Sequence, residues 1–303
     1  MPPRRNISLW FLLMLAVLLL LSACGSSPQP GTGNTSAIAV VAAENFYGDI
    51  VQQIGGDRVS VTSILTDPTV DPHEYESNVQ NAVAVSNARF VIKNGGGYDG
   101  WMDRLLAASP NTDRMVLTAY DAAPIKLPDN VHVWYSLEDI RAIARTIATS
   151  LKKLDSAHAA VFDHNLQQFE QALMPVQQRI DAIRGRYAGT AVGLTETIFL
   201  YQANPLGLKV LTPFEFQKAV AEGNDPPASS IIEASDQVAQ RMIKVLIYNV
   251  QTNTPVTTNL LNAAKRQHIP TVAVTETMPS ARTYQQWMLD QLVSLEQGLQ
   301  QQP

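Results

Sequence analysis

DSAHAAVFDHNLQQFEQALMPVQQRIDAIRG, the sequence of residues 155–185, carries a long and regular helical pattern. From Phe162 to Ile183, large apolar residues recur at alternating intervals of four and three positions, which places them on one face of an α-helix. Pro175 lies inside the pattern and should kink the helix, because proline cannot donate a backbone hydrogen bond. Gly185 is a suitable C-terminal cap. The pattern therefore predicts one long helix over residues 155–185.

A second helical pattern precedes it. Ser136 is a suitable N-cap for this helix, and Asp139 stands three residues later, where it would close a capping box. The apolar residues of the pattern again follow helical spacing, and they are Ile140, Ile143, Ile147 and Leu151. The middle of the chain is thus predicted to be helical throughout.

On either side of this region, short apolar runs alternate with helical patterns, which is typical of parallel sheets covered by helices on both faces. We therefore predict an α/β fold with two lobes, residues 37–154 and 186–303. Each lobe is a parallel sheet flanked by helices, and one long rigid backbone helix joins them and limits hinge opening. The predicted strands are residues 37–43, 59–65, 90–93 and 115–119 in the first lobe, and 190–194, 210–211, 245–248 and 271–274 in the second.

The N-terminal part of the chain predicts a location outside the cytoplasm. Two arginines precede the apolar run Leu9–Leu21, whose thirteen residues are fewer than the ~20 that a membrane-spanning helix needs. Two small residues and the only cysteine follow, a pattern that resembles the lipobox of bacterial lipoproteins. We predict a signal peptide at residues 1–23, a lipidated Cys24 that anchors the chain to the membrane, and a flexible tether over residues 24–36.

Composition excludes several classes of function. The chain has 303 residues with 22 Lys+Arg and 27 Asp+Glu, so its net charge of −5 provides no basic surface for nucleic acid. A single cysteine excludes an intramolecular disulfide and any zinc or iron–sulfur site built from several cysteines. No GxxxxGK[ST] or HExxH motif is present, so the sequence does not indicate a P-loop nucleotide site or a metalloprotease site. We expect a monomer.

Side chains that can bind a metal stand where predicted strands end. His73 follows the second predicted strand, Glu196 the fifth and Glu276 the eighth, while His132 lies just before the helix capped by Ser136. Open parallel sheets bind ligands beyond the carboxyl ends of their strands. Two facing lobes would therefore bring these four side chains to one cleft.

Four short motifs at these positions resemble the metal-binding lipoproteins of bacterial ABC importers for zinc and manganese, the zinc-uptake periplasmic binding protein family. The resemblance covers about residues 37–300, and the motifs are specific together although each alone is weak. They are Asp71-Pro72-His73 with Tyr75-Glu76, His132-Val133-Trp134, Glu196-x-x-Phe199-x-Tyr201, and Asn249 and Gln251 with Thr275-Glu276-Thr277.

The resemblance implies one buried divalent metal per chain between the lobes, delivered to a membrane permease without any catalysis. Glu196 stands where other members carry His or Glu, and Glu276 where Asp is more common, so these two positions depart from the usual ligand set. The implied metal ligands are His73, His132, Glu196 and Glu276, with Asp71 and Glu76 orienting His73 or capping the next helix and Tyr201 packing nearby.

The ligand chemistry leaves zinc and manganese open. Two neutral imidazoles and two carboxylates would neutralise a divalent cation, which offsets the cost of burying its charge. Four such ligands complete a tetrahedral zinc site, and bidentate carboxylates would raise the coordination number for manganese. A site without sulfur does not indicate Cu(I). Zinc should bind more tightly than manganese in almost any site of this kind, so affinity would not identify the cargo.

Two other functions remain as alternatives. A binding protein for a metal chelate, such as a siderophore or a corrinoid, also has two lobes and a rigid helix, but its cleft should be wide and rich in aromatic residues or arginine. A zinc hydrolase usually keeps three protein ligands and one open position for water, whereas four candidates are present here.

Overall fold

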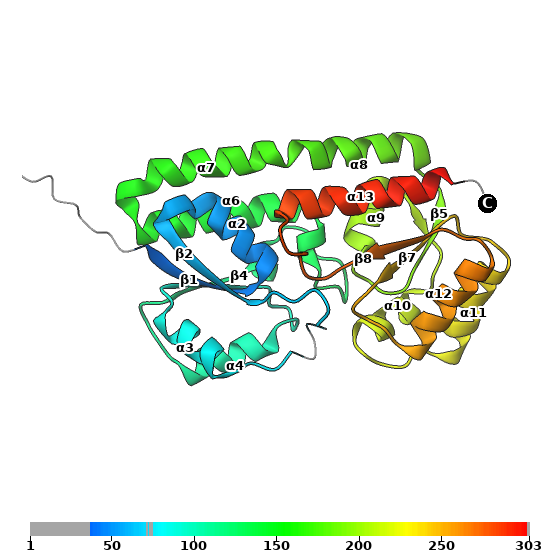
Figure 1. Cartoon of the computed structure of the whole chain (residues 1–303), viewed down its shortest axis with the longest axis horizontal. Coiled ribbons are helices and arrows are strands. Elements are labelled where there is room, and N and C mark those ends of the chain that lie inside the picture. The colour runs from blue at the N-terminus through cyan, green and yellow to red at the C-terminus, as the bar shows by residue number, and fades with distance from the viewer. Residues whose placement is uncertain (1–36, 71, 73–74, 302–303) are drawn as a thin grey trace, which may run out of the picture. The chain divides into compact units, whose positions relative to one another are not determined.

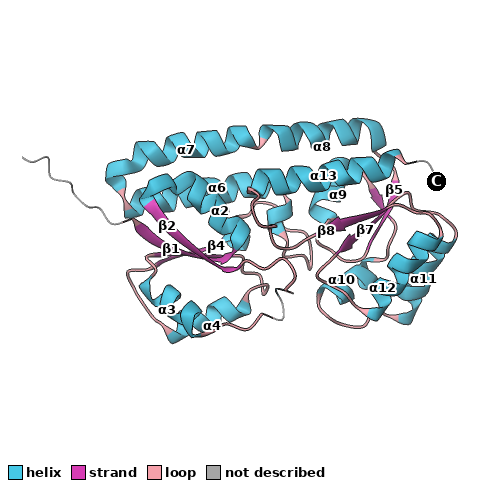
Figure 2. Cartoon of the chain, in the orientation of Figure 1, coloured by secondary structure: helices cyan, strands magenta, loops and turns pink. Residues whose placement is uncertain are grey.

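The computed structural model of the protein describes residues 37–301 except 71, 73 and 74, and these residues form two parallel sheets with helices on both sides (Figure 1, Figure 2). The predicted signal peptide, Cys24 and the tether lie outside the described residues. Among the described helices, none has both the length and the apolar character needed to cross a membrane.

The first lobe has four parallel strands in the order β2-β1-β3-β4. Six of the seven residues of β1 are buried, which is typical of a strand whose sheet is covered on both faces. The lobe consists of β1 (Ile38–Glu44), α2 (Asn45–Gly55), the 3-10 helix η1 (Gly56–Arg58), β2 (Val59–Leu65), α3 (Val79–Asn87), β3 (Phe90–Lys93), α4 (Gly100–Ala108), β4 (Met115–Thr118) and α5 (Ala119–Ala122).

The second lobe repeats the arrangement, with four parallel strands in the order β6-β5-β7-β8. In both lobes the first strand along the chain lies between the second and the third. The lobe consists of β5 (Ala191–Leu194), α9 (Leu200–Leu206), β6 (Lys209–Val210), α10 (Phe214–Ala221), α11 (Ala228–Ala239), β7 (Leu246–Asn249), α12 (Pro255–Arg266), β8 (Thr271–Val274) and α13 (Tyr284–Gln300). The predicted fold class is thereby confirmed.

The helical region between the lobes runs along one side of both sheets (Figure 1). It consists of the 3-10 helix η3 (Val133–Tyr135), α6 (Leu137–Leu154), the 3-10 helix η4 (Ser156–His158), α7 (Ala159–Ala172) and α8 (Met174–Tyr187). α7 packs on α6 and on α2 of the first lobe, and α8 packs on α9 and α13 of the second. The predicted long helix is therefore two helices in sequence, separated at Leu173, where Pro175 at the start of α8 cannot continue the backbone hydrogen bonding.

One apolar core extends through both lobes. It includes Val40 of β1, Ile143 of α6, Phe169 of α7, Ile183 of α8 and Leu295 of α13, all 2% exposed or less. Smaller clusters cover the outer face of each sheet, one under α3 and α4 and one under α10–α12. Because the two lobes share a core, moving one against the other would expose apolar surface, which resists wide opening.

The helix ends differ from the predicted caps in two places. α8 runs past Gly185 to Tyr187, and the left-handed backbone is found at Gly189, with φ +82°. Ser136 caps α6 as expected, but Asp139 does not complete a capping box, because its carboxylate accepts the backbone N–H of Ile125 at 2.8 Å. Aspartate is one methylene shorter than the glutamate that usually closes such a box.

Candidate metal centre

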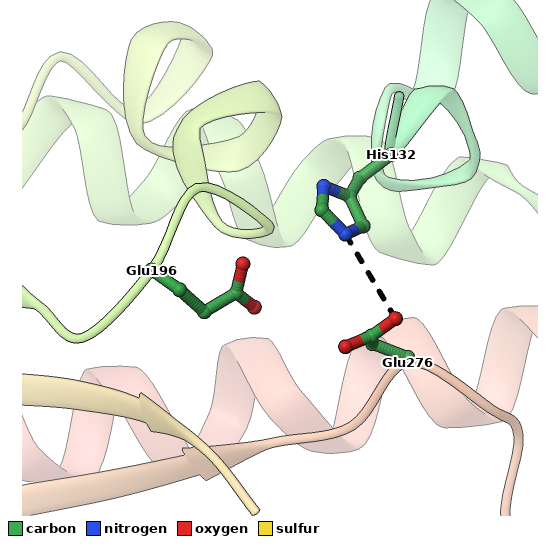
Figure 3. Close-up of side chains that lie close together, drawn as sticks. All are labelled: His132, Glu196 and Glu276. Atoms are coloured by element: carbon green, nitrogen blue, oxygen red, sulfur yellow. Dashed lines mark ion pairs between the residues drawn. The ribbon is translucent and has the colours of Figure 1, made fainter. Parts of the chain in front are cut away.

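Three of the four predicted ligands converge at the carboxyl ends of the sheets. One nitrogen of His132 and one carboxylate oxygen each of Glu196 and Glu276 lie within 4.8 Å of one another (Figure 3). Each side chain is 2% exposed or less. His132 directly precedes η3, Glu196 lies two residues after β5, and Glu276 lies two residues after β8. The site thus combines residues that are up to 144 positions apart, between His132 and Glu276, in the sequence.

His132 is held by Asn130, which lies two residues before it. The Asn130 side-chain oxygen is 2.8 Å from His132 Nδ1 and also accepts the backbone N–H of His132. The Asn130 amide nitrogen donates to the backbone oxygen of Thr197, which fixes the oxygen toward the imidazole. His132 Nδ1 must therefore carry the proton, so Nε2 presents its lone pair toward Glu276, whose Oε2 is 3.9 Å away.

Glu276 is oriented from both lobes. Its Oε1 accepts a hydrogen bond from Asn249 Nδ2 at 2.6 Å, and its Oε2 accepts one from the hydroxyl of Tyr98 at 3.0 Å. Its backbone N–H donates to Gln251 Oε1. Tyr98 belongs to the first lobe, so this glutamate links the lobes directly. These two hydrogen bonds fix the rotamer of the buried carboxylate.

Glu196 has fewer partners. Its Oε2 accepts the backbone N–H of Ile198 at 3.0 Å, whereas its Oε1 is buried and has no hydrogen bond among the described residues. Burial raises the pKa of this carboxyl well above its usual range, and the charge of Glu276 raises the pKa further. A carboxylate oxygen without a donor, next to a second carboxylate, is the chemistry that a cation would satisfy.

Aromatic rings close the site on the histidine side. The Trp134 ring centroid is 5.1 Å from that of His132, and the two rings meet edge to face. The Tyr98 ring packs on Trp134 at 4.8 Å. These rings replace water on the sides of the imidazole that they contact and lower the local dielectric constant, so charge interactions at the site are stronger than at the surface.

The remaining predicted residues fall in different places. His73 and Asp71 lie outside the described residues, and Glu76 is exposed. The segment just before them is tied to the site, since Gln251 Nε2 donates to the backbone oxygen of Val70 at 2.7 Å. Tyr201 is buried, and its hydroxyl donates to the backbone oxygen of Asn130, so it supports the loop that carries the histidine.

Two residues that support the site, Asn130 and Tyr98, were not predicted from the sequence. Asn130 could have been found, because an asparagine two residues before a ligand histidine is well placed to bond both its ring and its backbone. Tyr98 and Glu276 are 178 positions apart in the sequence, and no local sequence pattern predicts a contact between them.

Comparison with known proteins agrees with this architecture. The sequence profile of the family described as zinc-uptake complex component A, periplasmic (ZnuA), matches residues 40–298. The solved structure of the periplasmic zinc-binding protein TroA from Treponema pallidum superimposes with a TM-score of 0.75 at 17% identity, covering 88% of this chain and 100% of that one. At this identity the superposition concerns the fold alone.

Two curated relatives differ in their named metal. The manganese-binding lipoprotein MntA of Halalkalibacterium halodurans is 26% identical over 63% of this chain and 69% of its own length. The iron ABC transporter substrate-binding lipoprotein MtsA of Streptococcus pyogenes is 26% identical over 76% of this chain and 77% of its own. Several other curated relatives are matched over only 56% to 65% of their length.

Proposed function

Because the chain belongs to the ZnuA family of periplasmic zinc-uptake components, we propose that it is a solute-binding lipoprotein that captures one divalent transition metal, zinc or manganese, and delivers it to an ABC importer. The observation that carries the proposal is the convergence of His132, Glu196 and Glu276, three buried ligand groups within 4.8 Å of one another. Buried carboxylates at this spacing repel each other unless a proton or a cation lies between them.

His73 is proposed as the fourth ligand. Two observations support it: the chain just before this residue is bonded to Gln251 through Val70, and Gln251 also accepts the backbone N–H of Glu276. Two neutral imidazoles and two carboxylates give the set a formal charge of −2, which matches a divalent cation. Asp71 and Glu76 are proposed to orient His73, in the way that carboxylates commonly support metal-bound histidines.

Capture would proceed by exchange of ligands. The cation loses its water as the imidazole nitrogen and the carboxylate oxygens replace it, and any proton held by the two glutamates leaves. Asn130 keeps the histidine in the tautomer that coordinates, and Asn249 and Tyr98 keep Glu276 in place. Release requires one lobe to move slightly, since Tyr98 and Glu276 belong to different lobes and the loss of one ligand lowers the affinity.

The site supports a bare ion better than a chelate, because its ligand atoms are buried and lie within 4.8 Å of one another. Relatives are named for manganese, zinc and iron, and nitrogen–oxygen ligation suits all three. The cargo of this chain is proposed to be zinc or manganese. The remaining parts of the proposal are a lipid anchor at Cys24, a location outside the cytoplasm, a permease in the membrane as partner, and no enzymatic activity.

The experiment is a metal analysis of the full chain, extracted in detergent without chelator after growth in medium containing zinc and manganese. Native mass spectrometry and elemental analysis should find one metal per chain in the wild type. His132→Ala should lose it, whereas His164→Ala should keep it, because His164 is an exposed histidine on α7. Absence of metal from the wild type, with none taken up on addition, would contradict the proposal.

A further inference from the structure

A cavity of about 400 Å³ lies between the lobes and has His132 in its wall. The first lobe contributes the turn of Gly96, Gly97 and Tyr98, and the second contributes Thr197 and the end of α10 at Glu222. A water molecule occupies roughly 30 Å³ of liquid, so this space holds on the order of ten waters, enough for a hydrated divalent ion. It therefore connects a buried ligand to a space in which a hydrated ion fits.

The cavity wall contains a polar group with an unmet hydrogen bond. Thr197 is 1% exposed, and its hydroxyl has no hydrogen-bond partner among the described residues. A buried hydroxyl without a partner costs free energy, so such groups normally face water or a ligand. Thr197 directly follows Glu196 in the chain, so the wall of the cavity includes the residue next to a carboxylate of the metal centre.

Charged side chains from both lobes lie at the cavity. Lys218 of α10 donates to Asp129 Oδ2 at 2.8 Å, and this contact joins the second lobe to the loop that carries His132. Lys218 Nζ is also 3.8 Å from a carboxylate oxygen of Glu222. Asp129 and Glu222 both line the cavity. The rim, as we call Asp129, Glu222 and Lys218, thus has two carboxylates and one ammonium group, and the ammonium group bonds α10 to the loop of Asp129.

We propose that this cavity is the route by which the metal enters and leaves, that Asp129 and Glu222 attract the hydrated cation, and that Lys218 acts as a latch that slows its passage. The inference rests on the proposed function, because it concerns the same metal centre. The latch competes with the cation, since both are positive and both are attracted to the same two carboxylates.

The three rim residues should act differently on the rates. Removing Lys218 leaves the carboxylates and opens the latch, so both capture and release should accelerate. Removing the Glu222 charge weakens attraction but keeps the bond between Asp129 and Lys218, so capture should slow while release stays unchanged. Removing the Asp129 charge weakens the attraction and also breaks the bond to Lys218, so capture should slow and release should accelerate. Metal coordination itself is untouched in each case.

The test uses the full chain in detergent, with MnCl₂ alone and ZnCl₂ alone as probes. Capture is followed by stopped-flow fluorescence of tryptophan, because Trp134 packs against His132, and release is followed by transfer to a coloured chelator. Lys218→Met should raise both rates about two- to fivefold, the scale of an exposed ion pair. Glu222→Gln and Asp129→Asn should slow capture about two- to tenfold at low ionic strength and less at high ionic strength. Asparagine also tolerates the left-handed backbone of position 129, where φ is +48°.

The exposed pair between Lys152 and Asp163 is a matched control. Its side chains are 33% and 57% exposed, against 36% and 56% for Lys218 and Asp129, but it joins α6 to α7 and does not line the cavity. Lys152→Met and Asp163→Asn should leave both rates unchanged. Rim variants with the rates of the wild type would overturn the access route while leaving the proposed function intact. A wild type that binds neither ion would overturn the proposed function itself.

Discussion

Replacing Glu196 by glutamine should stabilise the metal-free protein and abolish its response to metal. The carboxyl is 2% exposed, one of its oxygens has no hydrogen bond among the described residues, and Glu276 lies beside it. Burial therefore raises the pKa of Glu196 in the folded state. Glutamine keeps the shape and the acceptor for the Ile198 N–H but carries no charge, so the cost of burying that charge disappears.

The size of the effect has an upper limit. A buried carboxyl can always take up a proton, and at pH 7 this costs about 1.36 kcal/mol for each unit between pH 7 and the ordinary pKa of 4.5, about 3.4 kcal/mol in all. The hydrogen bond from the Ile198 N–H offsets part of this cost in the wild type. We therefore expect Glu196→Gln to raise the free energy of unfolding of the metal-free protein by about 1–3 kcal/mol. With metal at a thousand times its dissociation constant, binding adds about 4 kcal/mol to the wild type and almost nothing to the variant.

The difference in stability between the wild type and Glu196→Gln depends on pH. Because its pKa is raised on folding, Glu196 makes the folded metal-free protein bind more protons than the unfolded chain above about pH 4.5. The wild type therefore loses stability as pH rises from this value toward the folded-state pKa, whereas Glu196→Gln does not. The stability advantage of the variant should vanish near pH 4.5 and should grow as the pH rises, until the pH exceeds the folded-state pKa of Glu196.

Thermal unfolding in chelator between pH 4.5 and 8.5 measures this difference, at about 2–4 °C per kcal/mol. Glu215→Gln, an exposed glutamate on α10, is the control and should show no such trend. Adding metal should reverse the order of wild type and variant. A Glu196→Gln protein that is no more stable than the wild type at pH 8 would show that burying the Glu196 charge costs no stability. One that is stabilised equally by metal would show that Glu196 is not a ligand.

Three further outcomes are expected. Asn130→Ala should weaken metal binding about 10- to 100-fold in a chelator competition, because the tautomer of His132 is then no longer fixed; wild-type affinity would contradict this role. Metal binding near neutral pH should release a proton from Glu196, whose pKa is raised by burial, seen as a calorimetric heat that changes with the ionisation enthalpy of the buffer; equal heats in all buffers would exclude it. Glu296→Ala should lower the free energy of unfolding by about 1–3 kcal/mol in urea titrations without changing metal affinity, because Glu296 of α13 is buried and binds both Arg179 and Arg186 of α8; an altered affinity would show that this contact also shapes the site.

The elements with strong apolar patterns could be predicted from sequence. The strands at residues 59–65, 90–93 and 271–274 have the predicted bounds, because each is a run of mostly β-branched or apolar residues between polar turns. Helix ends were harder to predict from the sequence. The helix ends past Gly185 because glycine tolerates a helical backbone as well as a cap, and Gly189 adopts the left-handed form instead. Spacing alone does not distinguish these positions.

The candidate site could be predicted as a set of residues but not as a network. Glu196 and Glu276 follow strands, and the ends of parallel strands meet at one edge, so their proximity follows from topology. The bond of Tyr98 to Glu276 depends on how the lobes face each other, and that is set by the shared core instead of by any local motif. The rim pair of Asp129 and Lys218 is a cross-lobe contact of the same kind.

The most direct test of the account is a crystal structure of the metal-loaded protein with anomalous diffraction collected at the metal edge. We predict a single anomalous peak per chain at about 2.0–2.2 Å from His132 Nε2, within bonding distance of Glu196 and Glu276, with His73 as the fourth ligand. A peak that contacts none of His132, Glu196 and Glu276, or the lack of any peak in protein shown to contain metal in solution, would contradict the account.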